Sequence, residues 1–114
     1  GDPDHYSELV KTTSDNGGVH TNSGIMNKVF YLLVNGGTNH ADTTGTTVQG
    51  IGMLAAAKVA YYADTVYCTA TDNYARVANA WVNAAKNQFG AGSTQAQQTF
   101  QAWKACGVTP TVTP

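Results

Sequence analysis

Residues 23–35, SGIMNKVFYLLVN, contain the clearest periodic pattern in the chain. Apolar side chains recur in this stretch at spacings of three and four residues, which predicts a helix. They are Ile25, Met26, Val29, Phe30 and Leu33. Two further apolar residues, Leu32 and Val34, widen the apolar face, so we expect the helix to be buried on most sides.

Polar and glycine residues flank this helix. Asn22 or Ser23 can cap its first amide groups, and Gly36-Gly37 is a strong signal for its end. Residues 1–22 predict a loop because turn-forming residues recur through them. Residues 38–50, rich in Thr and Gly, predict a second loop that ends in a short extended piece at 48–51.

The same periodicity predicts three more helices, over 52–66, 73–89 and 94–105. Gly90 and Gly107 stop the last two, and Ser93 caps the final one. The expected core side of the helix at 52–66 consists of Leu54, Val59, Tyr62, Ala63 and Val66. The aromatic residues expected in the core are Phe30, Tyr62, Trp81 and Trp103.

Four helices with short connections predict an all-α bundle. The 114 residues fit one domain, with a loop at 1–22, a bundle at 23–107 and a tail at 108–114. The tail alternates Thr, Pro and Val, which predicts a frayed end or the start of a linker. We expect both loops to lie over the same end of the bundle, which would hold His20.

Composition excludes several classes of function. Only 11% of residues are charged and the net charge is −1, so binding to nucleic acid through phosphate neutralisation is not expected. No apolar run approaches the roughly 20 residues that cross a bilayer. The low charge favours an extracellular protein. The sequence starts Gly1-Asp2-Pro3 without Met or a visible signal peptide, so we expect its natural start upstream or removed.

The chain contains two cysteines, Cys68 and Cys106. An even pair in a low-charge, extracellular chain favours a disulfide. Such a bridge would stabilise the fold by ~3–4 kcal/mol in the chain-entropy model. The alternative is two buried thiols, and a metal site is poorly supported because neither cysteine has a CxxC partner.

The run from Asp15 to Lys28, DNGGVHTNSGIMNK, carries the strongest chemical signal. Gly17-Gly18 let the backbone fold tightly enough for Asp15 and His20 to meet. An acceptor such as the Asp15 carboxylate would fix the tautomer of the imidazole, leaving the other nitrogen to donate or accept a proton. His5 is interpreted as a structural or exposed histidine, and His40 as a solvent-exposed loop residue.

This run resembles the thermolysin family of secreted zinc endopeptidases, in which a DNGGVH segment is followed by NSGIxNK. The resemblance covers nearly the whole chain and includes GDPDHY at 1–6, KVFYLL at 28–33 and ACGV at 105–108. It implies that the chain is the C-terminal portion of the helical lobe, incomplete at its start. It also implies that His20 donates to the tetrahedral intermediate, that Asp15 orients His20, and that 1–22 is an active-site loop.

The His-Glu-x-x-His zinc motif of the family is absent from the 114 residues. The family's zinc ligands, calcium-binding carboxylates and substrate-binding Arg precede the equivalent of Gly1. We therefore expect a fragment of a secreted zinc metalloendopeptidase, inactive alone. Zinc and calcium would belong to the parent protein, with no metal bound by this chain. Expected partners are the N-terminal remainder of the protease, or an inhibitor that covers exposed apolar surface; the parent would cut polypeptides.

The residues allow two other functions. A non-enzymatic helical module could bind a protein partner or inhibitor through the end that holds His20. An independent hydrolase with His20 as base is disfavoured, because Ser7, Ser14 and Ser23 lack a G-x-S-x-G context.

Overall fold

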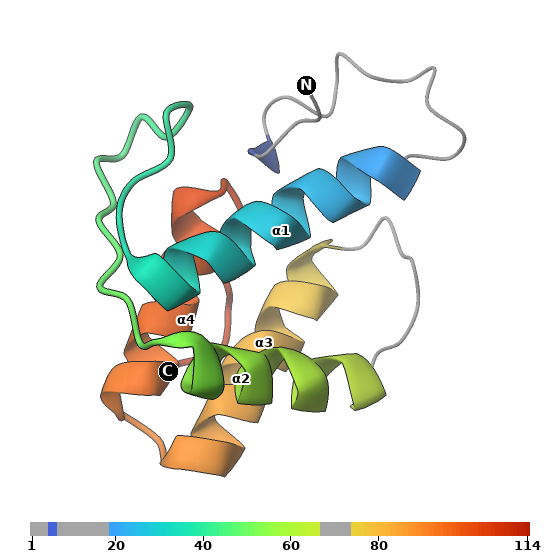
Figure 1. The fold of residues 1–114 in the computed structure, drawn as a ribbon, viewed down its shortest axis with the longest axis vertical. Coiled ribbons are helices and arrows are strands. Elements are labelled where there is room, and N and C mark those ends of the chain that lie inside the picture. Colours follow the sequence, from blue (N-terminus) through green and yellow to red (C-terminus); the bar gives the residue numbers. More distant parts are fainter. Residues whose placement is uncertain (1–4, 7–18, 67–73) are drawn as a thin grey trace.

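The computed structural model describes residues 5–6, 19–66 and 74–114, without the side chains of 19–23 and 64–66. Within these ranges the chain forms four helices, shown in Figure 1. They are α1 (Val19–Asn35), α2 (Met53–Val66), α3 (Tyr74–Phe89) and α4 (Thr94–Ala105). The described residues contain no strand, only an isolated antiparallel bridge between Gly37 and Val48. The prediction of an all-α fold is confirmed.

Three of the four helix starts lie within one residue of the predicted positions, but α1 starts earlier. It begins at Val19 rather than at residue 23, so Asn22 and Ser23 lie inside the helix and do not cap it. Once a helix has nucleated, each added residue gains a backbone hydrogen bond. Asn and Ser cost less than ~1 kcal/mol in a helix interior, so polar residues extend the helix by another turn.

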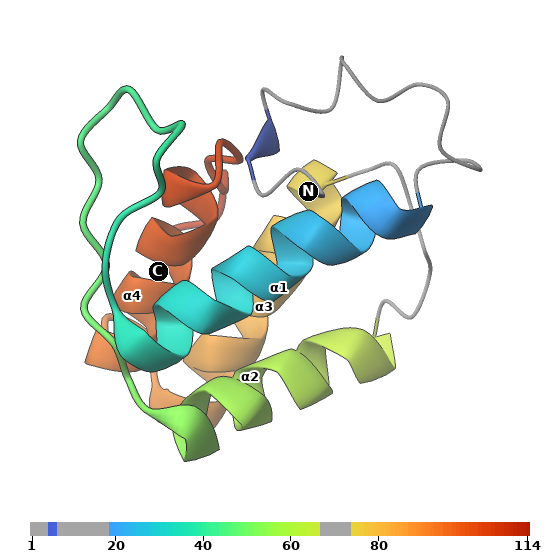
Figure 2. The same cartoon turned by 45° about the horizontal axis from the view of Figure 1, so that its top comes forward.

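The helices pack in two layers. Figures 1 and 2 show α1 and α2 crossing in front of α3 and α4. Helix α3 contacts α2 and α4, and α1 contacts both α2 and α4. The buried stripe of α1 consists of Ile25, Val29, Leu32 and Leu33, each at most 1% exposed. Met26, Phe30 and Val34 are partly buried, whereas Asn27, Tyr31 and Asn35 are exposed. The prediction that this helix is buried on most sides is therefore met only in part.

Two tryptophans join α3 to α4 at the centre of the core. Trp81 and Trp103 are 2% and 0% exposed, and their rings meet edge to face at 5.6 Å between centroids. Such pairs add ~0.5–1.5 kcal/mol beyond the area they bury. Both indole N–H groups lack a hydrogen-bond partner among the described residues, so apolar packing holds the rings in place.

The predicted core side of α2 is wrong at two positions. Leu54 is 89% exposed and Tyr62 is 41% exposed. Val59 and Ala63 are buried as predicted, and Ala56 is buried with them, each at most 2% exposed. The side chain of Val66 lies outside the described residues. The buried side of α2 therefore consists mainly of small side chains, which close packing in a protein interior can accommodate.

The loop between α1 and α2 is fixed at its base. Gly37 and Val48 exchange hydrogen bonds of 2.9 and 2.8 Å, so the extended piece predicted at 48–51 is paired only at its first residue. A Cβ on Gly50 would lie 2.6 Å from the Val34 carbonyl oxygen, so only glycine fits this approach. The loop leaves α1 at Asn35, the opposite end of the helix from His20, as Figures 1 and 2 show. The expectation that this loop borders His20 is therefore not met.

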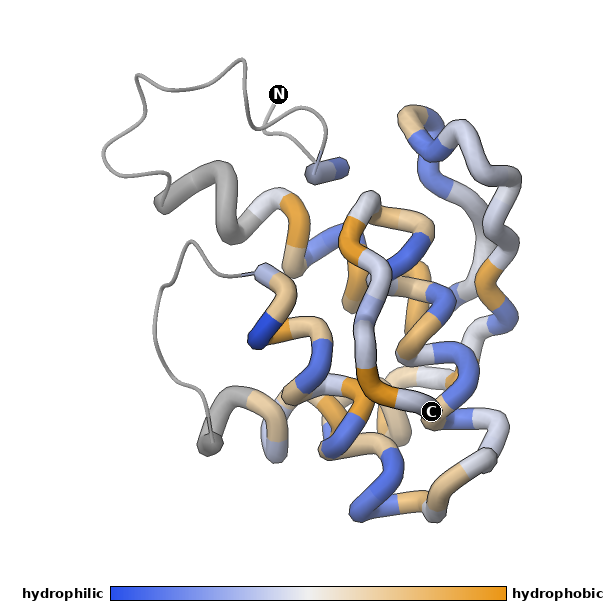
Figure 3. The backbone as a smooth tube through the Cα atoms, turned by 180° about the vertical axis from the view of Figure 1, so that it is seen from behind, coloured by the Kyte–Doolittle hydropathy of each residue, from blue (hydrophilic) through white to orange (hydrophobic). Residues whose placement is uncertain are grey.

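The C-terminal tail is docked, which corrects the prediction of a frayed end or linker. Asn79 on α3 accepts hydrogen bonds from the backbone N–H groups of Thr111 and Val112, at 2.8 and 3.3 Å, and its amide donates to the Thr111 hydroxyl at 2.9 Å. The Gly92 N–H donates to the Pro114 carbonyl at 2.8 Å. Figure 3 shows the tail running along the back of the bundle.

This docking makes Asn79 important for stability. Asn79→Ala removes these hydrogen bonds and should lower the free energy of unfolding by about 1–2 kcal/mol. Asn83→Ala, one turn further along α3 and exposed, gains the same helix propensity without losing a tail contact. Urea unfolding of both variants measures the difference, and equal stabilities would contradict the role of Asn79.

Candidate active-site helix

Helix α1 carries the histidine that the sequence singled out. His20 is the second residue of α1, so it lies in the first helical turn and not in a preceding loop. The side chain of His20 and all of Asp15 fall outside the described residues. Their contact therefore stays a prediction, and what the structure adds is the backbone position of His20.

The start of α1 favours negative charge. The first amide N–H groups of a helix have no carbonyl partner within it, and the helix dipole is positive there. The first turn of α1 contains no acidic residue that would neutralise this end. A ligand or intermediate that develops negative charge beside His20 would therefore be stabilised by the helix as well as by the imidazole.

One face of α1 remains exposed despite its apolar sequence. Asn27, Tyr31 and Asn35 recur every four residues and are all exposed, with Tyr31 at 55%. Residues advance by about 100° around a helix, so positions 20, 24, 27 and 31 follow one line along it. The exposed face therefore lies on the same side of α1 as the backbone position of His20.

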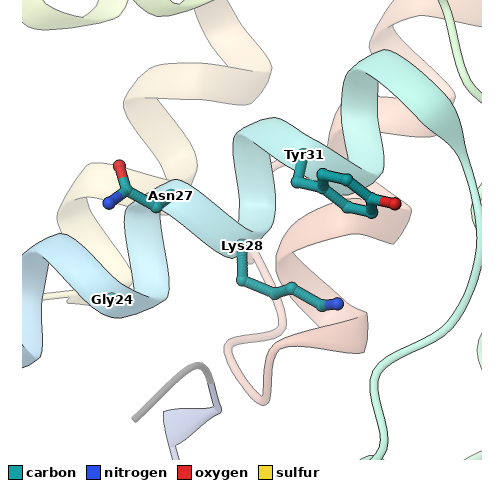
Figure 4. Close-up of a pocket in the computed structure, with 4 residues that line it drawn as sticks. All are labelled: Gly24, Asn27, Lys28 and Tyr31. Atoms are coloured by element: carbon teal, nitrogen blue, oxygen red, sulfur yellow. The ribbon is translucent and has the colours of Figure 1, made fainter. Parts of the chain in front are cut away.

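A shallow hollow of about 430 Å³ lies on this face, lined by Gly24, Asn27, Lys28 and Tyr31. Figure 4 shows Lys28 and Tyr31 side by side, with the ammonium 5.1 Å from the ring centroid. A cation at this distance from an aromatic ring is attracted to its face. The sequence did not predict this hollow. The one sequence feature that could have indicated it is Tyr31, a large aromatic residue that lies outside the apolar helical pattern of 25, 26, 29, 30 and 33.

The first described residues are attached to the ends of α3 and α4. Backbone N–H of Tyr6 donates to the Cys106 carbonyl at 2.7 Å, just beyond the end of α4. The ring of Tyr6 meets Tyr74, the first residue of α3, edge to face at 5.7 Å. His5 is only 8% exposed, so of its two predicted roles the structural one holds.

Other candidate residues divide between core and surface. His40 is exposed, as predicted. Cys106 is fully buried and accepts a hydrogen bond from the Asn39 amide at 3.6 Å. Cys68 lies outside the described residues, so the disulfide stays a prediction. Trp81 and Trp103 are core residues as expected, and Phe30 packs against the core from a partly buried position.

The described ranges contain neither a metal-ligand cluster nor a membrane span. In residues 5–6, 19–66 and 74–114, no three His, Cys, Asp or Glu side chains gather closely enough to hold a metal ion. Among the helices of the same ranges, none combines the length and apolarity needed to cross a membrane.

Comparison with known proteins decides the family. Residues 1–108 match the model of the thermolysin metallopeptidase alpha-helical domain. The chain belongs to this family. Bacillolysin of Brevibacillus brevis is 48% identical to it over 108 residues, which are 95% of this chain and 20% of the relative. Thermolysin of Alicyclobacillus acidocaldarius is 45% identical over 108 residues, 95% of this chain and 19% of the relative.

The thermolysin-like chain spans about a fifth of the length of these relatives. Another relative, the thermostable neutral protease NprT of Geobacillus stearothermophilus, is 45% identical with similar coverage. The match includes the run from Asp15 to Lys28 and extends to Val108. It confirms the sequence-based resemblance and identifies the four helices as part of the family's helical domain.

The burial of Tyr74 at the start of α3 predicts a pH effect. Burial raises the pKa of Tyr74 from its ordinary 10.0 to about 12, and Tyr6 adds to the rise. The unfolded chain loses the Tyr74 proton near pH 10.0, whereas the folded chain keeps it until about pH 12. The contribution of Tyr74 to stability is therefore complete below pH 10.0 and is lost as the pH rises toward about 12. Tyr74→Phe should therefore lose less stability than the parent chain over this interval. Thermal unfolding as a function of pH tests this, and parallel losses would refute it.

Proposed function

We propose that this chain supplies His20 and Asp15 to the active site of a secreted zinc metalloendopeptidase that hydrolyses polypeptides. The observation that carries the proposal is the position of His20 in the first turn of α1, within a segment that belongs to the thermolysin family. The rest of the active site would come from the N-terminal remainder of the parent protein.

In this proposal His20 donates a hydrogen bond to the oxyanion of the tetrahedral intermediate. Attack of water on a peptide carbonyl places negative charge on the carbonyl oxygen, and a fixed donor aimed at that oxygen lowers the barrier. Asp15 accepts a hydrogen bond from the other imidazole nitrogen. Both ring nitrogens donate only in the protonated imidazolium, and the negative charge of Asp15 favours that form. The positive end of the α1 dipole acts in the same direction.

Zinc and calcium belong to the parent protein in this proposal, as the family resemblance implies. The described residues do not fit a metal centre, because they contain no suitable group of three ligands. We therefore assign no metal to the described residues and derive no step of the reaction through one.

Exposed apolar side chains on α2 support contact with the rest of the parent protein, or with an inhibitor. Met53, Leu54 and Tyr61 are 58%, 89% and 63% exposed. Exposed apolar residues on a single helix favour burial against a partner. An alternative function, a non-enzymatic module that binds a partner through the His20 end, predicts the same exposure without catalysis.

The experiment uses the whole Brevibacillus brevis bacillolysin with residues 1–108 of this chain in place of its matching segment. His20→Ala should lower kcat by about 10²- to 10³-fold with little change in KM, because the donor acts in the transition state. Asp15→Asn should lower kcat by a smaller factor, because His20 remains but loses the carboxylate that orients its ring and favours its protonated form. Cleavage of a peptide substrate measures both.

His40→Ala is the matched control, since it removes a histidine from an exposed loop and should leave kcat unchanged. Full activity of the folded His20→Ala enzyme would refute the proposal. A folded but inactive hybrid enzyme without substitutions would instead favour the non-enzymatic module.

A further inference from the structure

We infer that His5 and Tyr6 position the segment that leads to His20, by clamping its start to the ends of α3 and α4. We call this group the N-terminal clamp and define it as His5, Tyr6, Tyr74 and Gly107 with the Cys106 carbonyl. The inference rests on the proposed function and deepens it, because it adds positioning residues to the site that holds His20.

The backbone contact of the clamp joins the two ends of the chain. Tyr6 N–H donates to the Cys106 carbonyl at 2.7 Å, across one hundred residues of sequence. This bond is short for an N–H to carbonyl contact. Cys106 itself is fully buried at the C-terminal cap of α4. The bond therefore ties the start of the chain to a rigid part of the core.

Gly107 provides the surface on which His5 rests. A Cβ at this position would lie 2.7 and 3.0 Å from His5 Cε1 and Nε2, and 3.0 Å from Tyr6 Cβ. Gly107 also has φ of +93°, which glycine adopts without strain. The absence of a side chain thus lets His5 and Tyr6 approach the end of α4, and His5 is 8% exposed as a result.

The aromatic contact completes the clamp on the α3 side. Tyr6 and Tyr74 meet at an interplanar angle of 77° with 5.7 Å between centroids, a favourable edge-to-face arrangement. Tyr6 is 46% exposed, while Tyr74 is 5% exposed. The buried ring therefore serves as a fixed platform, and the exposed ring is the part that it holds.

Clamping matters for catalysis because of where the chain goes next. Residues 7–18 connect the clamp to Val19, the first residue of α1, and include Asp15. A segment tethered at both ends has fewer conformations than one tethered at a single end. Holding a catalytic pair in its reactive geometry before substrate binds lowers the barrier, and small misplacements cost up to ~10²-fold in rate.

The decisive experiment compares two glycines in the hybrid enzyme described above. Gly107 and Gly90 both follow a helix and have φ of +93° and +103°. A Cβ on Gly90 meets nothing within 4 Å, whereas one on Gly107 meets the clamp. Gly90→Ala thus introduces the same backbone strain as Gly107→Ala without displacing His5. We expect Gly107→Ala to lower kcat about 10-fold or more with little change in KM, and Gly90→Ala to leave both unchanged.

Variants of Tyr6 give a second test that avoids strain. Tyr6→Ala removes the edge-to-face contact and should lower kcat, while Tyr6→Phe keeps the ring and should retain activity. His20→Ala separates the two proposals. If His20→Ala lowers kcat and neither Gly107→Ala nor Tyr6→Ala does, the clamp is refuted and the proposed function stands. If His20→Ala has no effect, the proposed function fails.

Amide hydrogen exchange on the 114-residue chain tests the clamp without catalysis. The Tyr6 amide should be protected in the parent chain and in Gly90→Ala, and should exchange at least about 10-fold faster in Gly107→Ala. Equal protection of the Tyr6 amide in both glycine variants would overturn the inference.

Discussion

The edge-to-face contact between Trp81 and Trp103 holds the centre of the bundle together. It joins α3 to α4, and these two helices provide the surfaces against which α1 and α2 pack. Because both rings are almost completely buried, removing either would leave a cavity that the surrounding side chains could not fill. The position of the candidate site on α1 therefore depends on this core, although His20 itself is not among the core residues.

Helix α1 is fixed at its end by backbone contacts. Ile51 N–H donates to the Leu33 carbonyl at 2.7 Å, and Gly50 packs against the backbone of Val34. The middle of the helix is held by its buried stripe. These contacts fix the axis of α1 and thereby the backbone position of His20. A rigid element that carries a catalytic group keeps it within the narrow range of positions that catalysis requires.

The sequence predicted the helices well because their periodicity is strong. Helix α4 has the predicted bounds, and Ser93 accepts the capping hydrogen bond from the Ala96 amide at 3.1 Å. Local patterns could not decide which side of α2 is buried, because Leu54 and Ala56 are both apolar and only the neighbouring helices choose between them. They also could not predict the docked tail, which depends on Asn79, some thirty residues away in sequence.

The candidate site was predicted by motif rather than by geometry. The run from Asp15 to His20 indicated the family by itself, since its residues match a specific pattern. Periodicity placed the start of α1 too late, because the polar residues at 20–22 lack apolar spacing and are as typical of a helix cap as of a helical turn. The sequence could not predict the N-terminal clamp, because His5 and Gly107 lie close together in the fold but far apart along the chain.

The role of His20 is tested most directly by the affinity of the hybrid enzyme for a phosphonate peptide, an anionic tetrahedral analogue of the transition state. A donor that acts on the oxyanion stabilises such an analogue far more than it stabilises a planar peptide. We predict that His20→Ala weakens phosphonate binding by about the same factor as it lowers kcat/KM, while the affinity for a product peptide stays unchanged. Unchanged phosphonate affinity in the folded His20→Ala enzyme would contradict the role of His20 as the oxyanion donor.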